Sequence, residues 1–302
     1  MTLKHLVDAR QLDPTIVTEL CHRAEFYRGQ GPLNELQGKK LGTWFHQRST
    51  RTRWSFESAM LQLGGSVISE PNAEANSSPG KGESLEDSIH MIDDYVDCIV
   101  MRHPQWGSAE IAAAESDVPV INAGDGANQH PTQALVDAYT MLLEFGHIGT
   151  LHVAIVGDLA NGRAPRSLCY LLSQYKVKLT LVSPPDWRMK DDVKEFMRSH
   201  HPQVEETTEF KDVVREADVI YMLRNQQEYK TEEGRSDEVP YVIDTGTLSL
   251  AKKDARIMHP LPHCKEIQLP RDVEKNDRRI AYERQAKNAP YIRMALLAHL
   301  LK

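Results

Sequence analysis

The 302-residue sequence has no run of about 18 apolar residues and no apolar segment of signal-peptide type near its start. We therefore expect a cytoplasmic protein that does not enter a membrane. Only four cysteines are present, far apart, with no Cys-x-x-Cys pair and no histidine at zinc-ligand spacing. No metal site is predicted, and free thiols are expected at Cys21, Cys98, Cys169 and Cys264.

Aromatic residues are scarce, at 7%, but the hydrophobic share of 40% and the charged share of 26% are ordinary for a folded, soluble protein. The formal net charge of -7 argues against general attraction to nucleic acid or to an anionic membrane, so an anionic ligand needs specific cationic residues. The length exceeds the size at which one hydrophobic core usually keeps growing. Two domains with a cleft between them are therefore expected.

The glycine patterns of nucleotide-binding loops are also missing. The segment VGDLANGR, residues 156–163, follows an apolar run but lacks the G-x-G-x-x-G spacing. The segment GKGES, residues 80–84, is only a fragment of G-x-x-x-x-G-K-[ST]. A nucleotide-dependent α/β enzyme is therefore disfavoured.

Short apolar runs alternate with amphipathic segments, an order typical of parallel sheets covered by helices. The strands expected in the first half are Leu41–Phe45, Ser66–Ile68, Cys98–Met101 and Val118–Ile121. The helices expected there are Asp13–Arg28, Arg53–Leu63, Ser84–Tyr95, Ser108–Glu115 and Pro131 to about Phe145.

The alternation starts again in the second half, and its apolar segments are His152–Val156, Leu168–Tyr175, Lys178–Val182 and Val219–Met222. A last helix with one buried face is expected over about Pro290–Leu301. We predict an α/β protein of two domains, each a mainly parallel sheet flanked by helices. The predicted domains are residues 1–132, joined by the C-terminal helix at about 285–302, and residues 133–284.

The segment Ser49-Thr-Arg-Thr-Arg53 follows one expected strand and opens a helix. Hydroxyl groups and free backbone N–H groups at an electropositive helix terminus suit a phosphate, and Arg51 adds a planar fork of donors. An ordinary Ser/Thr helix cap beside a solvated arginine is the alternative interpretation.

Other polar residues also follow expected strands, where open α/β sheets bind ligands. Arg102 follows one strand, and the segment NAGDGANQHPTQ, residues 122–133, follows another. A structural turn explains its glycines but not the cluster of two amides and His130. Arg163 and Arg224 also lie just past strands and are candidates to bind a dicarboxylate, although solvated loop arginines are commoner.

Seven segments occur in a fixed order along the chain: FHQRSTRTRWSFESAM, KGESLEDSI, MRHPQ, NAGDGANQHPTQALVD, VGDLANGR, YMLRNQQE and HPLPHCKEI. Together they resemble the aspartate carbamoyltransferases of the aspartate/ornithine carbamoyltransferase superfamily, over roughly residues 40–300. The resemblance implies transfer of the carbamoyl group of carbamoyl phosphate to L-aspartate, a reaction of de novo pyrimidine biosynthesis. It implies no cofactor and no metal.

The resemblance also implies site residues. The residues implied at carbamoyl phosphate are Ser49, Thr50, Arg51, Thr52, Ser77, Lys81, Arg102, His130 and Gln133. Those implied at aspartate are Lys81, Arg163, Arg224, Gln226, Leu261 and Pro262, the last two through loop carbonyls that receive the amino group. Those implied as catalytic are Arg51, Thr52, Lys81, Arg102 and His130, and Thr50, Arg102 and His130 are implied at the carbonyl oxygen.

Ser77 and Lys81 match a loop that, in this family, reaches into the neighbouring subunit's site. A homotrimer with shared active sites is therefore implied, and regulatory or pathway-enzyme chains are further candidate partners. The H-C-L-P motif and Ser-Met-Gly loop of the ornithine enzymes are absent, because Pro260 and the pair Arg224 and Gln226 stand there instead.

The sequence departs from the family pattern at three places. Tyr229 and His263 stand where arginines are common, so both departures remove positive charge near the acceptor. Ala160-Asn161 differ from residues that couple subunits in some regulated members. Another amino-acid acceptor therefore stays an alternative, as does a non-catalytic carbamoyltransferase-like scaffold, against which the intact Arg51, Lys81 and His130 argue.

Overall fold

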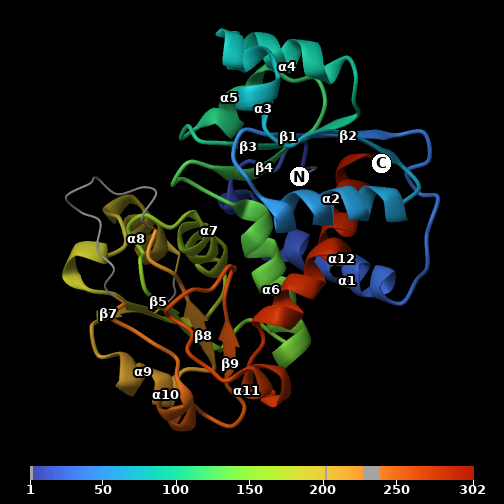
Figure 1. The fold of residues 1–302 in the computed structure, drawn as a ribbon. Coiled ribbons are helices and arrows are strands. Elements are labelled where there is room, and N and C mark those ends of the chain that lie inside the picture. The colour runs from blue at the N-terminus through green and yellow to red at the C-terminus, as the bar shows by residue number, and fades with distance from the viewer. Residues whose placement is uncertain (1–2, 201–202, 227–238) are drawn as a thin grey trace. The chain divides into compact units, whose positions relative to one another are not determined.

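The computed structural model describes residues 3–200, 203–226 and 239–302, and only the backbone of Pro79 and Lys81 (Figure 1). The chain divides into two compact units: Met1–Tyr139 with Asn288–Lys302, and Thr140–Lys287. Each unit holds one sheet, and every strand pair in both sheets is parallel. The predicted fold class, parallel sheets flanked by helices, is confirmed.

The first unit is built on a four-stranded sheet of order β2-β1-β3-β4. Its strands are β1 (Lys40–Phe45), β2 (Ser66–Glu70), β3 (Cys98–His103) and β4 (Val120–Asp125). Its helices are α1 (Pro14–Arg28), α2 (Thr50–Gln62), α3 (Ala73–Asn76), α4 (Leu85–Asp93) and α5 (Ser108–Glu115), with the short 3-10 turns η1 (Ala9–Gln11) and η2 (Ser78–Lys81). Helices α3 to α5 lie on one side of the sheet and α2 on the other (Figure 1).

Local sequence explains where these helices begin. Asp13 caps α1 by accepting from Thr15 N and Ile16 N, and Pro14 occupies the first helical position. Helix α2 begins at Thr50, three residues before the predicted start at Arg53, so Thr50 to Thr52 form its first turn. Strand β4 begins at Val120 and not at Val118, and continues to Asp125, because the polar residues after Ile121 are also buried.

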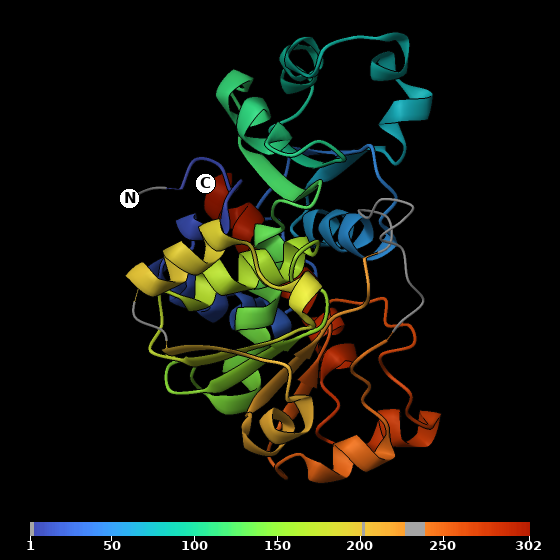
Figure 2. The ribbon, with the colours of Figure 1, turned by 90° about the vertical axis from the view of Figure 1, so that its left-hand side faces the viewer.

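The second unit is built on a five-stranded sheet of order β7-β6-β5-β8-β9. Its strands are β5 (His152–Val156), β6 (Lys178–Val182), β7 (Gln203–Thr207), β8 (Val219–Met222) and β9 (Arg256–Met258). Its helices are α7 (Arg163–Leu172), α8 (Asp191–Ser199), α9 (Phe210–Glu216), α10 (Thr245–Leu250) and α11 (Arg271–Asn276), with the 3-10 turn η3 (Pro185–Trp187). Helices α7 and α8 lie on one face of the sheet, and α9 and α10 on the other (Figures 1 and 2).

Both boundaries between the units fall inside helices, α6 (Pro131–Phe145) and α12 (Tyr282–Leu300). The prediction that the last helix begins at about Pro290 is wrong, because α12 begins at Tyr282 and Pro290 lies within it. A proline is expected in the first turn, but its missing N–H removes only one helical bond, and the buried face of α12 outweighs that loss. The predicted buried face is confirmed at Ile292, Ala295 and Leu296.

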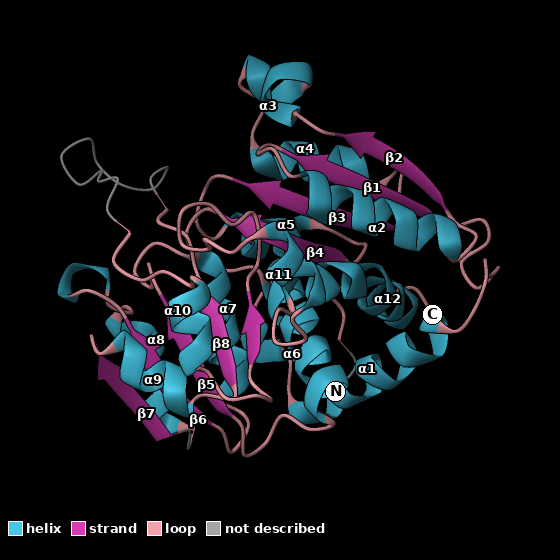
Figure 3. Cartoon of the chain, turned by 60° about the horizontal axis from the view of Figure 1, so that its bottom comes forward, coloured by secondary structure: helices cyan, strands magenta, loops and turns pink. Residues whose placement is uncertain are grey.

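The C-terminal part of α12 lies beside α1 (Figures 1 and 3), where His299 Nδ1 is 3.1 Å from Glu19 Oε1. In the second unit the start of α12 is tied to α6, because Glu144 accepts from Arg284 Nε and from Arg256 Nε, each at 2.6 Å. Among the described residues, no helix is both long and apolar enough to cross a membrane.

Candidate active site

The order in which strands are added to the sheet of the first unit reverses between β1 and β3, which is a topological switch point. From β1 the chain adds β2 on one side, and then β3 and β4 on the other. Phe45 pairs with Arg102 and His103 pairs with Asp125, so the loops after β1, β3 and β4 leave the same edge of the sheet. Ligands of open α/β sheets bind outside the carboxyl ends of strands at such a point.

The loop after β1 leads into an open helix terminus. Ser49 is the N-cap of α2, but its side chain makes no capping hydrogen bond. Arg51 is exposed, and among residues 3–200, 203–226 and 239–302 no side chain pairs with its guanidinium. Arg53, by contrast, donates to Glu57 Oε1 at 3.1 Å and to Ser69 Oγ at 2.8 Å. The two arginines of the motif therefore differ: Arg53 is structural, and Arg51 is available to an anion.

Arg102 lies within β3, one residue before its end, and not after the strand as predicted. His130 lies on the loop after β4, at the same edge. Arg102 Nη1 donates to Ala123 O at 3.3 Å. His130 is buried, with Nδ1 3.2 Å from Thr132 Oγ1, and Gln133 Nε2 donates to Asp137 Oδ1 at 2.7 Å. The first unit thus brings Arg51, Arg102 and His130 to one edge of its sheet, at the ends of β1, β3 and β4.

The loop that carries His130 is held by Asp125, a buried residue that the sequence did not single out. Asp125 Oδ1 accepts from Asn122 Nδ2 at 2.8 Å and from Gln129 N at 3.0 Å. Its Oδ2 accepts from Asn128 Nδ2 at 2.9 Å and from Gly107 N at 3.0 Å. Asn128 therefore has a structural role, and so does Gln129, whose Oε1 accepts from Ala9 N at 2.8 Å.

Helix α12 supports the first turn of α2 from inside the unit. Arg293 is buried and donates Nη1 to Thr52 O at 3.3 Å, and its guanidinium carbon lies 4.6 Å from the centroid of the Phe56 ring. Burial lowers the pKa of Arg293 to about 9, which still leaves it charged at pH 7. Sequence reasoning missed this residue because nothing in the pattern of α12 distinguishes it.

Two histidines lie beside this edge, at the ends of β1 and β3. The rings of His46 and His103 meet edge to face at 4.4 Å, and His103 Nδ1 accepts from Gln105 N at 3.1 Å. Burial and the nearby His46 lower the pKa of His103 to about 4, and burial also lowers the pKa of His46. Both rings are therefore neutral at pH 7.

The strand order of the second sheet reverses between β5 and β8, where Val156 pairs with Met222. Gly157 follows β5 with φ +123°, and a Cβ there would lie 2.6 Å from Leu223 O, so only glycine allows this close approach. Asp158 then joins the loop after β5 to the loop after β8, because its carboxylate accepts from Asn161 N and from Gln226 N, each at 3.1 Å.

Those two loops carry the residues predicted to bind the acceptor. Arg163 is the first residue of α7, and Arg224 and Gln226 follow β8. All three are partly exposed. Leu261 and Pro262 follow β9, which is next to β8, and Leu261 has φ +54° with a cis peptide bond to Pro262. The second unit therefore also gathers its predicted residues at one edge of its sheet.

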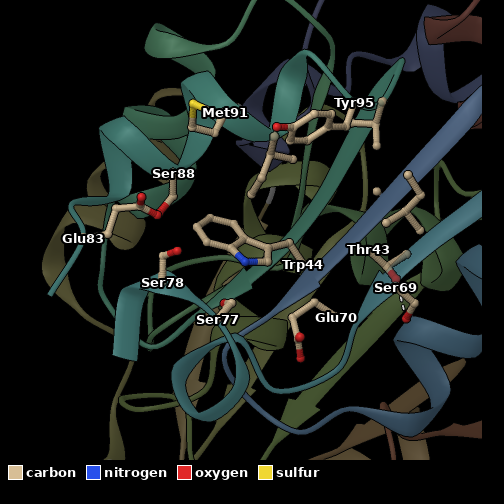
Figure 4. Close-up of a pocket in the computed structure, with 14 residues that line it drawn as sticks. Thr43, Trp44, Ser69, Glu70, Ser77, Ser78, Glu83, Ser88, Met91 and Tyr95 are labelled. Carbon is tan, nitrogen blue, oxygen red and sulfur yellow. Dashed lines mark hydrogen bonds between the residues drawn. The ribbon is translucent and has the colours of Figure 1, made fainter. Parts of the chain in front are cut away.

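Ser77 lies elsewhere in the first unit. Its hydroxyl donates to Ala73 O at 2.7 Å, and it lines a pocket of about 510 Å³ with Trp44, Glu70, Glu83 and Tyr95 (Figure 4). The pocket lies between α4 and the strands β1 and β2, and among the described side chains implied at carbamoyl phosphate Ser77 alone lines it. The side chain of Lys81 and the whole of Tyr229 lie outside the described residues.

His263, which stands where the family pattern has arginine, is placed against acidic and aromatic neighbours. Its Nε2 lies 3.2 Å from Glu274 Oε1, and its ring centroid lies 5.3 Å from that of Tyr282. Among the described residues, no group of three or more His, Cys, Asp or Glu side chains is arranged to hold a metal ion.

Family models match both parts of the chain. Residues 4–142 match the carbamoyl-P binding domain of aspartate/ornithine carbamoyltransferases, and residues 150–300 match the Asp/Orn binding domain. The chain belongs to this family. It is a carbamoyltransferase.

Individual relatives agree with the family match. The chain is 44% identical to a chloroplastic aspartate carbamoyltransferase of Oryza sativa, covering 100% of this chain and 86% of that protein. It is 42% identical to the multifunctional protein CAD of Squalus acanthias, over 89% of this chain but only 12% of that protein. A solved aspartate transcarbamoylase of Trypanosoma cruzi, in complex with carbamoyl phosphate and aspartate, is similar with a TM-score of 0.91 and 35% identity, covering 99% of this chain and 97% of that one.

We predict that Asp125→Asn destabilises the first unit. In the variant one of the two carboxylate oxygens is replaced by an NH2 group, which cannot accept hydrogen bonds from the two buried donors that face that oxygen in the original chain. The free energy of unfolding should therefore fall by about 2–3 kcal/mol. Urea denaturation measures this, with Asp94→Asn as the control, because Asp94 is exposed on the surface at the end of α4. Equal stability of the two variants would show that Asp125 does not hold the loop.

The neutral His103 predicts a pH dependence of stability. Because the pKa of His103 is about 4 in the folded chain and the ordinary value is 6.5, the unfolded chain takes up the proton first as the pH falls. The stability from this group is present above pH 6.5 and is lost between about 6.5 and 4.

His103→Asn keeps an acceptor for Gln105 N but does not titrate, so its unfolding free energy should fall less between pH 7.5 and pH 5 than that of the original chain. The control is His22→Asn, at an exposed position on α1. A pH dependence of His103→Asn as steep as that of the control would contradict the assignment.

Proposed function

We propose that this carbamoyltransferase uses L-aspartate as its acceptor, converting carbamoyl phosphate and L-aspartate to N-carbamoyl-L-aspartate and phosphate. The observation that carries the proposal is that each of the two sheets gathers cationic residues at its carboxyl edge. One edge combines the uncapped terminus of α2 with Arg51, Arg102 and His130, and the other combines Arg163 with Arg224. Each edge suits one anionic substrate.

In this proposal the first unit binds carbamoyl phosphate. The N–H groups of the first turn of α2, the hydroxyls of Ser49, Thr50 and Thr52, and the Arg51 fork hold the phosphate. Arg102, His130 and Gln133 contact the carbamoyl group. Arg51 is suited to this task because no described side chain pairs with its guanidinium in the folded chain.

The second unit binds the acceptor in this proposal. Aspartate carries two carboxylates, and Arg163 and Arg224 supply two guanidinium groups for them, while Gln226 adds an amide. Ornithine carries a cationic side chain, which two arginines would repel. The carbonyls of the Leu261–Pro262 loop accept hydrogen bonds from the amino group of the acceptor.

The reaction is an acyl transfer in which the neutral amine attacks the carbonyl carbon and phosphate leaves. Oxyanion charge develops on the carbonyl oxygen of the tetrahedral intermediate, where Thr50, Arg102 and His130 donate hydrogen bonds. The phosphate itself can take up the proton of the attacking amine, so the protein mainly orients two substrates and neutralises charge. Lys81 is assigned to both substrates.

We further propose a homotrimer in which Ser77 and Lys81 serve the site of the adjacent subunit. Ser77 supports this because it lines a pocket on the side of the sheet covered by α4, and Arg51 does not line that pocket. Exposed apolar side chains on the outer face of α2 also support association: Trp54 is 61% exposed and Leu61 is 59% exposed, and both line a surface pocket of about 490 Å³ with Pro32.

A cytoplasmic location and a place in de novo pyrimidine biosynthesis are part of the same proposal. The plant relatives of Oryza sativa, Pisum sativum and Arabidopsis thaliana carry the word chloroplastic in their names, so a chloroplast location is the alternative outcome. Cell fractionation tests it directly. Pathway-enzyme chains stay candidate partners, since one relative is a multifunctional protein.

We predict that the purified chain, supplied with carbamoyl phosphate, carbamoylates aspartate at least roughly a hundredfold faster than ornithine or putrescine, because Arg163 and Arg224 pair with the carboxylates of aspartate and repel a cationic acceptor. Chromatography of N-carbamoylaspartate, citrulline and N-carbamoylputrescine measures the products in parallel. Preferential turnover of ornithine or putrescine would overturn the acceptor assignment.

The shared site predicts complementation. Lys81→Ala chains and His130→Ala chains should each be inactive, but mixing them should restore up to about a quarter of the original activity, through hybrid sites that contain neither substitution. Mass measurement in solution should give a trimer or a multiple of one. If the hybrids stay inactive while both variants fold and assemble, the site is not shared.

A further inference from the structure

The loop after β9 has a backbone conformation that needs support. Leu261 has φ +54°, which lies in a backbone region that residues other than glycine rarely occupy. In the proposed function, the carbonyls of Leu261 and Pro262 receive the amino group of the acceptor, so the direction of these carbonyls matters for the reaction. The surroundings of the loop show what holds it.

His259 supplies the support on the inner side of the loop. Its Nδ1 accepts from Leu261 N at 2.8 Å, and its Nε2 lies 2.9 Å from Glu266 Oε1. Glu266 Oε1 also accepts from Cys264 N at 2.8 Å, and His259 N donates to Gln285 Oε1 at 2.9 Å. His259, Glu266 and Gln285 are all buried. One histidine and one carboxylate therefore hold both ends of the Leu261–Cys264 turn.

These contacts fix the tautomer of His259. A backbone N–H needs a lone pair, so Nδ1 carries no hydrogen, and Nε2 carries the hydrogen and donates to the Glu266 carboxylate. A second proton on Nδ1 would face Leu261 N–H. Burial lowers the pKa of His259, and this effect outweighs the hydrogen bond and charge of Glu266, which act in the opposite direction. The imidazole is thus a neutral connector between Glu266 and the loop backbone.

We propose that His259 and Glu266 are positioning residues for the acceptor: through Nδ1 of His259 they fix the peptide before Leu261, and so set where the Leu261 and Pro262 carbonyls point. This rests on the proposed function, because the acceptor amine is what the carbonyls receive. Neither residue touches a substrate in the proposal. Carbamoyl phosphate, assigned to the first unit, should not sense them.

Two substitutions at His259 separate its two nitrogens. His259→Asn places an amide oxygen near the position of Nδ1 and can still accept from Leu261 N, but it cannot reach Glu266. His259→Gln can reach Glu266 from the position of Nε2 but leaves Leu261 N without its acceptor. We expect His259→Gln to raise KM for aspartate about tenfold, equivalent to about 1.4 kcal/mol, and His259→Asn to raise it less than threefold.

Glu266 gives an independent pair. In Glu266→Gln the amide oxygen can accept from both His259 Nε2 and Cys264 N, so KM for aspartate should stay near that of the original chain. Glu266→Ala removes both contacts and should behave like His259→Gln. In all four variants the Kd of inorganic phosphate, measured by calorimetry, should change less than twofold.

Glu144→Gln is the matched structural control, because Glu144 also accepts hydrogen bonds from two side chains of the second unit but is not part of the loop. It should lower stability without changing KM for aspartate. Thiol titration checks folding: Cys264 is exposed and the other three cysteines are buried, so a folded chain should show one fast thiol.

The outcomes distinguish the two proposals. If the original chain does not carbamoylate aspartate, the proposed function fails, whatever the variants do. If it does, but His259→Gln and His259→Asn raise KM equally, or Glu266→Ala only lowers stability as Glu144→Gln does, the positioning role is wrong.

Discussion

The candidate site depends on one constraint, the pairing of parallel strands at the two topological switch points, where the strand order of each sheet reverses. Phe45 pairs with Arg102, and Val156 pairs with Met222, so the loops that follow these strands emerge together. The carboxyl edge of a parallel sheet then collects side chains that are far apart in the sequence. Arg51 and His130 reach one edge in this way, and Arg163 and Arg224 reach another. The backbone approach at Gly157, where a Cβ would lie 2.6 Å from Leu223 O, shows how tightly the second pair of loops is set.

The charges at these edges are arranged for binding anions and not for abstracting protons. Arg51 is exposed at an uncapped helix terminus, and Arg293 places a second, buried cation beneath the same turn. The histidines nearby are held neutral, His103 by burial and its neighbour His46, and His259 by the hydrogen bond that it accepts. Fixed donors of this kind cost little reorganisation when charge develops in an acyl transfer.

The sequence predicted the strands with continuous apolar runs, such as Val219–Met222, because strands buried on both faces of a parallel sheet leave that pattern. It did not predict β7, an edge strand with three exposed positions, or β9, which is only three residues long. In the site, arginines just past strands could be found from position alone. Asp125, His259 and Glu266 could not, because their roles come from hydrogen bonds to backbone groups that no spacing encodes. The start of α12 was predicted at about Pro290, but the helix begins at Tyr282 and contains this proline.

The central claim is that each arginine edge binds its own substrate. Arg51→Ala should weaken carbamoyl phosphate directly, whereas Arg224→Ala should spare it and weaken aspartate, each by about 3 kcal/mol, or roughly a hundredfold in kcat/KM. Calorimetric titration of both folded variants with a phosphonate analogue of carbamoyl phosphate measures this most directly. The account predicts that Arg224→Ala binds the analogue as the original chain does, while Arg51→Ala loses most of its affinity. Equal loss of that affinity in both variants would contradict it.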